Sequence, residues 1–141
     1  MNYQIKEVDG VAFADTISNF NKYVDTWPLL QQRHHTDGYW WLVFCNTEVV
    51  AFAGLVPFDP CPNVGYLKRC YVLPEHRGQS LQQQLIQVRE NKAKELGWIT
   101  ILSDCRISNT RSSASFRRAG YRLCDPEQPW EKDSLYWVKE I

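Results

Sequence analysis

Residues 71–82 read Tyr71-Val72-Leu73-Pro74-Glu75-His76-Arg77-Gly78-Gln79-Ser80-Leu81-Gln82. The stretch predicts the end of a strand, a short loop that begins at Pro74, and the start of an amphipathic helix. The first N–H groups of a helix have no partner within the helix and carry the positive end of its dipole, so they suit a pyrophosphate. Arg77 adds a positive charge there, and Gly78 lets the backbone approach a ligand closely. The alternative interpretation is an ordinary strand-loop-helix connection without a ligand.

Hydrophobic periodicity predicts elements on both sides of this stretch. Before it, we expect a strand at Tyr3–Val8, a helix over 11–24, a short helix that starts near Trp27-Pro28, and strands at Tyr39–Cys45, Glu48–Pro57 and Val64–Leu73. After it, we expect a helix from Leu81 to Leu96, a strand at Trp98–Leu102, a helix at Asn109–Ala119, and strands at Tyr121–Cys124 and Leu135–Val138. No repeat or linker interrupts this order, so we expect one mixed α/β domain over residues 1–141.

Composition and charge argue against several classes of function. The 141 residues carry 16 Lys and Arg against 16 Asp and Glu, so neither a nucleic acid nor an anionic membrane is expected as a partner. The five cysteines are odd in number and show no C-x-x-C spacing, so we expect no disulfide framework and no metal site. The N-terminal residues lack the apolar segment of a signal peptide, which favours a reducing, cytoplasmic location.

A second informative segment reads Asn109-Thr110-Arg111-Ser112-Ser113-Ala114-Ser115-Phe116-Arg117-Arg118-Ala119-Gly120-Tyr121. It resembles the element N-x-x-A-x-x-L-Y-x-x-x-G-F/Y of the GNAT family of N-acetyltransferases. Asn109, Gly120 and Tyr121 lie at the family's offsets, and Ser112 stands in place of a small alanine.

The stretch 71–82 resembles the earlier signature of the same family, Q/R-x-x-G-x-G/A at a strand-to-helix turn. Arg77 matches its first position, whereas Ser80 and Gln82 stand where the family has glycine or alanine. One helix and one strand are expected between the two segments, as the family requires. The resemblance therefore covers nearly the whole chain.

The resemblance implies an α/β (α+β) fold with a mixed, mostly antiparallel sheet flanked by helices. At its centre, the parallel strands Val64–Val72 and Ile99–Asp104 would splay apart and expose unpaired backbone groups for the amide-rich pantetheine arm. Acetyl-CoA is the implied cosubstrate. A homodimer is kept open.

The resemblance also assigns cofactor contacts residue by residue. Val72 and Leu73 would pair with pantetheine through their backbone. Asn109 would hydrogen-bond the cofactor near pantetheine, or act only as a helix N-cap. The pyrophosphate would lie on the segment formed by Arg77, Gly78, Gln79, Ser80, Leu81 and Gln82.

The implied reaction is direct attack of a primary amine, on a small molecule or a peptide, on the thioester in a ternary complex. An alkyl amine has a pKa near 10.4, so about one in a thousand or fewer is neutral at pH 7 and a general base helps. Asp104 is the candidate base because it ends a predicted strand; a turn or capping carboxylate is the alternative. An amide near Val72 could hold the thioester oxygen, and a nucleophilic role for Cys70 is disfavoured.

One departure affects the chemistry directly. The family often carries its proton donor on a tyrosine that corresponds to Phe116 here, and phenylalanine cannot donate a proton. The nearby Ser113 and Ser115 are expected on the helix surface. Two interpretations stay open: an active N-acetyltransferase, and a catalytically impaired module that binds acyl-CoA or a partner.

The histidine pair and two of the tryptophans are the remaining candidates for a functional role. His34-His35 is expected at a solvated helix end, because adjacent helical side chains lie about 100° apart and do not share a metal. Trp130 is expected in the core or at its rim. Trp27 and the loop Phe58–Asn63 are candidates for an aromatic acceptor wall.

Overall fold

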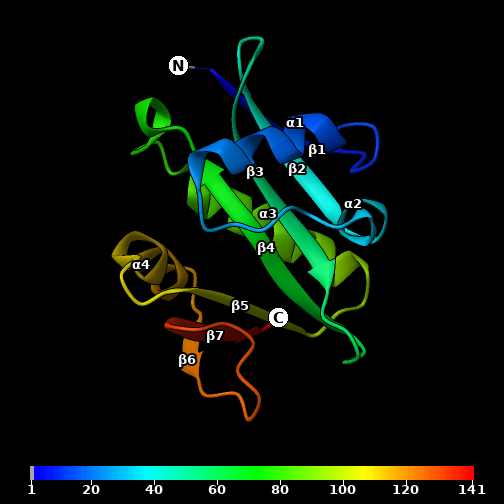
Figure 1. Cartoon of the computed structure of the whole chain (residues 1–141), viewed down its shortest axis with the longest axis vertical. Helices are drawn as coiled ribbons and strands as arrows, with labels where there is room; N and C mark the ends of the chain where they lie inside the picture. Colours follow the sequence, from blue (N-terminus) through cyan, green and yellow to red (C-terminus); the bar gives the residue numbers. More distant parts are fainter. Residues whose placement is uncertain (1) are drawn as a thin grey trace. The chain divides into compact units, whose positions relative to one another are not determined.

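A computed structural model describes residues 2–141 (Figure 1). Seven strands follow the order β1-β2-β3-β4-β5-β7-β6 in one sheet, and β4 with β5 is a parallel pair among antiparallel neighbours. This confirms the predicted mixed, mostly antiparallel α/β fold. In the described part of the chain, no helix is long and apolar enough to cross a membrane.

The chain divides into two compact units. Unit 1 takes the chain up to Val56 together with Lys68–Leu85, and unit 2 takes Pro57–Leu67 together with Ile86–Ile141. Strand β4 (Val64–Val72) and helix α3 (Leu81–Glu95) each contribute to both units.

Unit 1 is built on three antiparallel strands, β1 (Tyr3–Val8), β2 (Tyr39–Cys45) and β3 (Glu48–Pro57). The β2–β3 hairpin has the predicted bounds, and Asn46 in its turn has a φ of 58°, a conformation that asparagine tolerates well. Val43 and Phe44 mark a shift in its register.

A helical segment covers one face of these strands, as Figure 1 shows for α1 (Ala14–Ser18). The 3₁₀ helix η1 (Asn19–Tyr23) continues it, so the single helix expected over 11–24 is two shorter ones. Ile17 and Phe20 from this segment pack on Trp40, Leu42 and Phe52 of the strands, and Phe20 stacks on Phe52 at 4.3 Å between ring centres.

The predicted start of the second helix is wrong. Helix α2 (Gln32–Asp37) begins several residues after Trp27-Pro28. Trp27 instead packs its ring on Phe52, and the Pro28 carbonyl accepts a hydrogen bond from Arg69. These tertiary contacts hold the segment in loop form, and Gln31 and His34 cap the later helix with a reciprocal capping box.

Unit 2 places β5 (Thr100–Arg106) between the start of β4 and strand β7 (Ser134–Glu140), with β6 (Arg122–Cys124) beyond β7. The parallel register joins Val64–Tyr66 to Thr100–Leu102. Helix α4 (Thr110–Arg118) packs Phe116 on Trp137 of β7. Strand β5 runs two residues past Asp104, so Asp104 lies inside the strand and not at the strand end that the sequence predicts.

Candidate functional site

The loop between β4 and α3 makes a sharp turn that ends at a helix start. A 3₁₀ turn, η2 (Pro74–His76), follows β4, and Gly78 and Ser80 then adopt positive φ values of 80° and 61° before α3 begins at Leu81. These two left-handed residues turn the chain sharply into α3, whose first N–H groups have no partner within the helix. The predicted pyrophosphate segment is therefore a local cradle at a helix start.

The cradle is open to a ligand. Gly78, Gln79 and Ser80 are exposed, and a Cβ placed on Gly78 would meet nothing within 4 Å. Leu81 behind them is buried and anchors the helix start. Ser80 adopts here, at a strain cost, the left-handed conformation that glycine adopts freely. Ser80 thus has a left-handed backbone at a position where the resemblance to the family expects glycine.

Arg77 lies back on the strand that precedes it. Its Nε donates to the carbonyl oxygen of Val72 at 3.0 Å, and its guanidinium carbon lies 5.2 Å from the ring centre of Tyr71. The backbone N–H of Leu73 donates to Val50 at 2.9 Å. Pairing of a pantetheine amide with Val72 would thus have to replace or share the Arg77 contact.

Strand β4 carries an irregularity that the sequence does not signal. Arg69 has a φ of 61° in the middle of the strand, a left-handed conformation rare for a long side chain. Its guanidinium donates to Asn21 Oδ1 at 2.8 Å and to the Pro28 carbonyl, and its carbon lies 4.8 Å from the Trp27 ring centre. These contacts, which come from η1 and from the loop that follows it, stabilise the strained residue.

Asp104 has a specific partner within unit 2. The hydroxyl of Tyr66 on β4 donates a hydrogen bond to Asp104 Oδ1. Burial and the neighbouring Asp104 carboxylate raise the pKa of Tyr66, so its hydroxyl stays protonated and acts as a donor at neutral pH. Both side chains are half-buried. The structure thus brings Asp104 together with an aromatic residue that sequence reasoning placed only on a strand face.

Two aromatic rings from separate segments pack on Tyr66. Phe58 lies 6.0 Å and Trp130 lies 6.3 Å from the Tyr66 ring centre, and the Phe58 and Trp130 centres are 5.1 Å apart. Trp130 also contacts Tyr136 on β7 at 4.6 Å. The sequence predicts Phe58 in a candidate acceptor wall. It places Trp130 only in the core or at its rim, because no local pattern links the Trp130 loop to β4.

Helix α4 shows what replaces the family tyrosine. Phe116 is buried and packs on Tyr121 and Trp137, at 5.5 and 5.7 Å between ring centres. Ser113 and Ser115 are also buried, so their predicted surface position is wrong; the face of α4 that carries Phe116 turns inward and takes them along. Asn109 caps the helix, since its Oδ1 accepts from the N–H of Ser112 at 3.1 Å.

The histidine pair is not a solvated helix end. His35 is buried, and its Nδ1 lies 3.1 Å from the carbonyl oxygen of Gly10. His34 Nδ1 accepts from the N–H of Gln31 at 3.0 Å. Burial first, and then the nearby positive charges of Lys68 and Arg33, lower the pKa of His34 to about 4.

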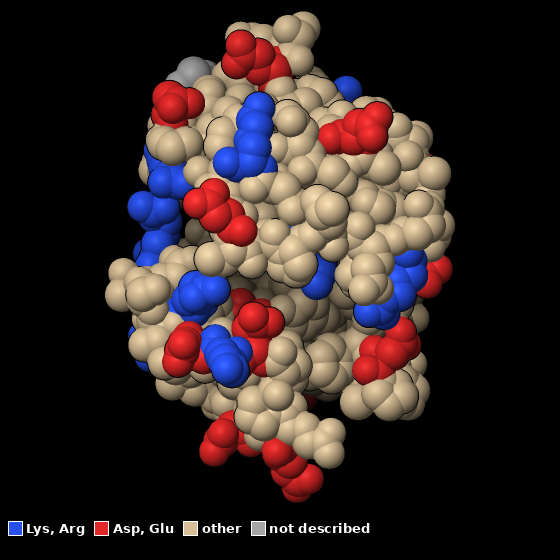
Figure 2. All heavy atoms as spheres, in the orientation of Figure 1, with Lys and Arg blue, Asp and Glu red and all other residues tan. Residues whose placement is uncertain are grey.

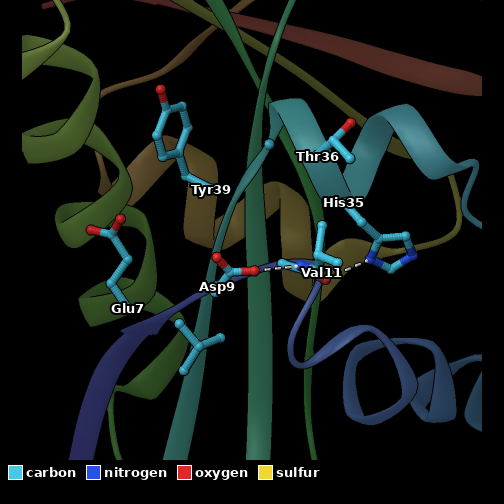
Figure 3. A pocket seen from close by; sticks show the side chains of 9 residues that line it. Glu7, Asp9, Val11, His35, Thr36 and Tyr39 are labelled. Atoms are coloured by element: carbon cyan, nitrogen blue, oxygen red, sulfur yellow. Dashed lines mark hydrogen bonds between the residues drawn. The ribbon is translucent and has the colours of Figure 1, made fainter.

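A hollow of about 240 Å³ in unit 1 adjoins His35 (Figure 3). It is lined by Glu7, Val8, Asp9, Gly10, Val11, His35, Thr36, Gly38 and Tyr39. Two of these side chains already contact backbone groups. Asp9 Oδ1 accepts from the N–H groups of Val11 and Ala12, each at 2.9 Å, and His35 Nδ1 lies beside the Gly10 carbonyl. None of the predicted cofactor residues lines this hollow, and we assign it no ligand.

On the face drawn in Figure 2, basic and acidic side chains are interspersed. This agrees with equal numbers of the two kinds in the sequence.

Comparisons with known proteins concern the family and the fold of the chain. A family model described as the acetyltransferase (GNAT) family matches residues 11–121. A search of curated proteins finds no match. Among solved structures, an acetyltransferase of the GNAT family from Staphylococcus aureus is 16% identical with a TM-score of 0.79, over 99% of each chain.

Two further structures carry more specific descriptions. The ribosomal-protein-S18-alanine N-acetyltransferase from Escherichia coli is 14% identical with a TM-score of 0.77, over 99% of this chain and 94% of that one. The PaiA N-acetyltransferase from Thermoplasma acidophilum, in complex with coenzyme A, is 14% identical with a TM-score of 0.74, over 100% of both chains. At these identities the likeness concerns the fold.

Proposed function

Because the chain belongs to the acetyltransferase (GNAT) family, whose cosubstrate is acetyl-CoA, we propose that it transfers an acetyl group from acetyl-CoA to a primary amine of a small molecule or a peptide. The observation that carries the proposal is the open cradle Gly78–Ser80 at the start of α3. Its exposed amides suit the CoA pyrophosphate, with Arg77 beside them. We place the activity in the cytoplasm and propose no metal; a homodimer stays open.

The residues present fit an acyl-CoA thioester. The strand end at Val72 and Leu73 offers backbone groups to an extended amide-bearing chain. Arg77 would leave the Val72 carbonyl and turn toward the pyrophosphate, where its charge gains more than in its contact with a neutral oxygen. Asn109, whose Oδ1 already caps α4, would contribute its amide nitrogen.

The bound thioester supplies the acetyl group and a thiolate leaving group. Asp104 accepts one proton from the protonated amine, which becomes a neutral nucleophile. The amine nitrogen then forms a bond to the carbonyl carbon, the C–S bond breaks, and the second proton goes to the thiolate or to water. The Tyr66 hydroxyl on Oδ1 orients the carboxylate, so Tyr66 is a positioning residue.

A CoA-release assay with a panel of primary amines tests this function. For the active amine we expect Asp104→Asn to lower kcat by about 10²-fold or more, as removal of a general base does, with acetyl-CoA affinity unchanged by calorimetry. Asp125→Asn is a matched control, because Asp125 is an exposed carboxylate elsewhere in unit 2. Equal loss in both variants, or none in Asp104→Asn, would remove Asp104 from the base role.

The buried Phe116 favours a second candidate, a module that binds acyl-CoA without turnover. Helix α4 offers no phenol where the family often has one, so the thiolate would leave unprotonated or be protonated by water. In this case calorimetry gives acetyl-CoA binding and no amine in the panel releases CoA. Absence of binding at millimolar acetyl-CoA would contradict both candidates.

A further inference from the structure

Four aromatic side chains from separate segments of unit 2 pack on one another, and one of them, Tyr66, donates to the Asp104 carboxylate. We call this set, Phe58, Tyr66, Asp104, Trp130 and Tyr136, the Asp104 aromatic cluster. Phe58 follows β3, Tyr66 lies on β4, Asp104 on β5, and Trp130 and Tyr136 lie before and on β7. Trp130 contacts each of the other three rings, at 4.6 to 6.3 Å between centres.

The cluster has a packed base and a more exposed front. Tyr136 is 7% exposed, and its hydroxyl holds the loop that carries Trp130, accepting from the N–H of Glu131 at 3.0 Å and donating to the carbonyl of the same residue. Phe58, Tyr66, Trp130 and Asp104 are only half-buried. Aromatic faces and a carboxylate edge are therefore presented together by a braced loop and three strands.

The electrostatics of this front favour a cation. The Asp104 carboxylate and, more weakly, Glu131 place negative charge beside Tyr66, and both raise the pKa of that phenol. The protonated Tyr66 adds a dipole but no positive charge. The faces of tryptophan, tyrosine and phenylalanine rings add a negative electrostatic potential of their own.

We propose that the Asp104 aromatic cluster is the acceptor subsite and that it selects amines in their protonated, alkylammonium form, with an apolar body next to the nitrogen. Asp104 binds the ammonium group, and Trp130 and Phe58 contact the adjoining carbons and contribute cation–π attraction. A neutral aryl amine or an alcohol has no charge to offer and binds weakly. This inference rests on the proposed function, because it names the class of amine that the reaction uses.

In this arrangement one carboxylate, Asp104, serves both to bind the ammonium group and to accept its proton. The carboxylate that holds the ammonium is the one that accepts its proton, so no movement of the acceptor separates the two steps. Trp130 acts through Tyr66 as well as directly, since its ring packs at the edge of the phenol that orients Asp104. Loss of Trp130 is therefore expected to raise KM more than it lowers kcat, whereas loss of Asp104 affects both.

The test uses 2-phenylethylamine and 2-phenylethanol, which share shape and differ in charge at pH 7. With the full chain and no acetyl-CoA, we expect calorimetry or NMR titration to show the amine binding about tenfold tighter than the alcohol. Asp104→Asn and Trp130→Leu each remove most of this difference, and Trp130→Phe restores much of it because the π face returns. Asp125→Asn leaves it unchanged, and circular dichroism checks that each variant is folded.

The outcomes separate this inference from the proposed function. Equal binding of amine and alcohol, or a full difference retained in Asp104→Asn and Trp130→Leu, overturns the ammonium subsite even if CoA release is seen with another acceptor. Selective ammonium binding that depends on Asp104 and Trp130 supports the subsite, whether or not CoA is released. If binding is selective and no CoA is released, the acetyltransferase activity is contradicted and the subsite is not.

Discussion

Lys139 and Glu90 form an ion pair whose removal tests how unit 2 is held together. Lys139 Nζ lies 3.0 and 3.2 Å from the two carboxylate oxygens of Glu90, and 2.7 Å from the carbonyl oxygen of Ala119 at the end of α4. The Glu90 side chain is 4% exposed and that of Lys139 is 29% exposed. One ammonium thus connects α3, β7 and the C-cap of α4.

Lys139→Met keeps an unbranched apolar stem and removes the charge. The Glu90 carboxylate then stays buried without this cation, and the Ala119 carbonyl loses a donor. Breaking a buried pair from one side costs about 3–5 kcal/mol. Because the lysine side is partly exposed and water can reach it, we expect about 3 kcal/mol. For a chain of this size, that lowers Tm by roughly 10 °C.

Urea unfolding followed by tryptophan fluorescence measures this free energy. Two controls sharpen the reasoning. Lys139→Arg keeps the charge and is expected to cost less than Lys139→Met, and the double variant Glu90→Gln with Lys139→Met removes the buried charge as well and recovers part of the loss. A cost below about 1 kcal/mol in Lys139→Met, the range of exposed pairs, would refute the view that this pair is buried and structural.

Three other changes test separate parts of the fold. Gly54→Ala places a Cβ 2.5 Å from the fully buried Trp40 ring, so we expect the free energy of unfolding to fall by about 1–3 kcal/mol. An unchanged urea midpoint would contradict that contact. The pKa of His34 is lowered to about 4 from 6.5, so the unfolded chain binds more protons between these pH values and the free energy of unfolding falls as the pH drops through them. Because His34 is partly exposed, we expect a loss of about 1 kcal/mol between urea melts at pH 7.5 and 4.5. The variant His34→Gln, whose amide can still accept from the N–H of Gln31, should abolish this pH dependence. Phe116→Tyr buries a hydroxyl at a 7%-exposed site and should cost about 1–3 kcal/mol without raising CoA release, and a faster, equally stable enzyme would show that the hydroxyl reaches the reaction.

Local chemistry made much of the fold predictable. The β2–β3 hairpin needs only a run of apolar, β-branched and aromatic residues on each side of Asn46, and both strands have the predicted bounds. Helix α3 begins at Leu81 as expected and ends at Glu95, one residue before the predicted Leu96, next to Gly97 with its φ of 79°. Turn residues and periodicity act over a few positions, so one sequence is enough to place them.

Long-range contacts decided the elements that were mispredicted. Trp27-Pro28 has the pattern of a helix start, yet Arg69, some forty residues later, binds the Pro28 carbonyl and keeps the segment as a loop. The left-handed conformation of Arg69 has no sequence signal at all. His35 is buried because Gly10 and Trp40 are brought against it, which adjacent residues do not reveal.

The sequence by itself determined the cradle, because Arg77, Gly78 and the start of α3 are consecutive and their backbone geometry follows from neighbouring residues. It also led to two predictions, that Asp104 is the candidate base and that Phe116 stands at the position where the family often has its proton donor. Only the tertiary structure decided what lies beside Asp104: Tyr66, far from it in the chain, donates to its carboxylate, and Trp130, held by a braced loop, packs on Tyr66. Hydrogen bonds and ring contacts between distant segments depend on three-dimensional proximity, which periodicity and spacing do not encode.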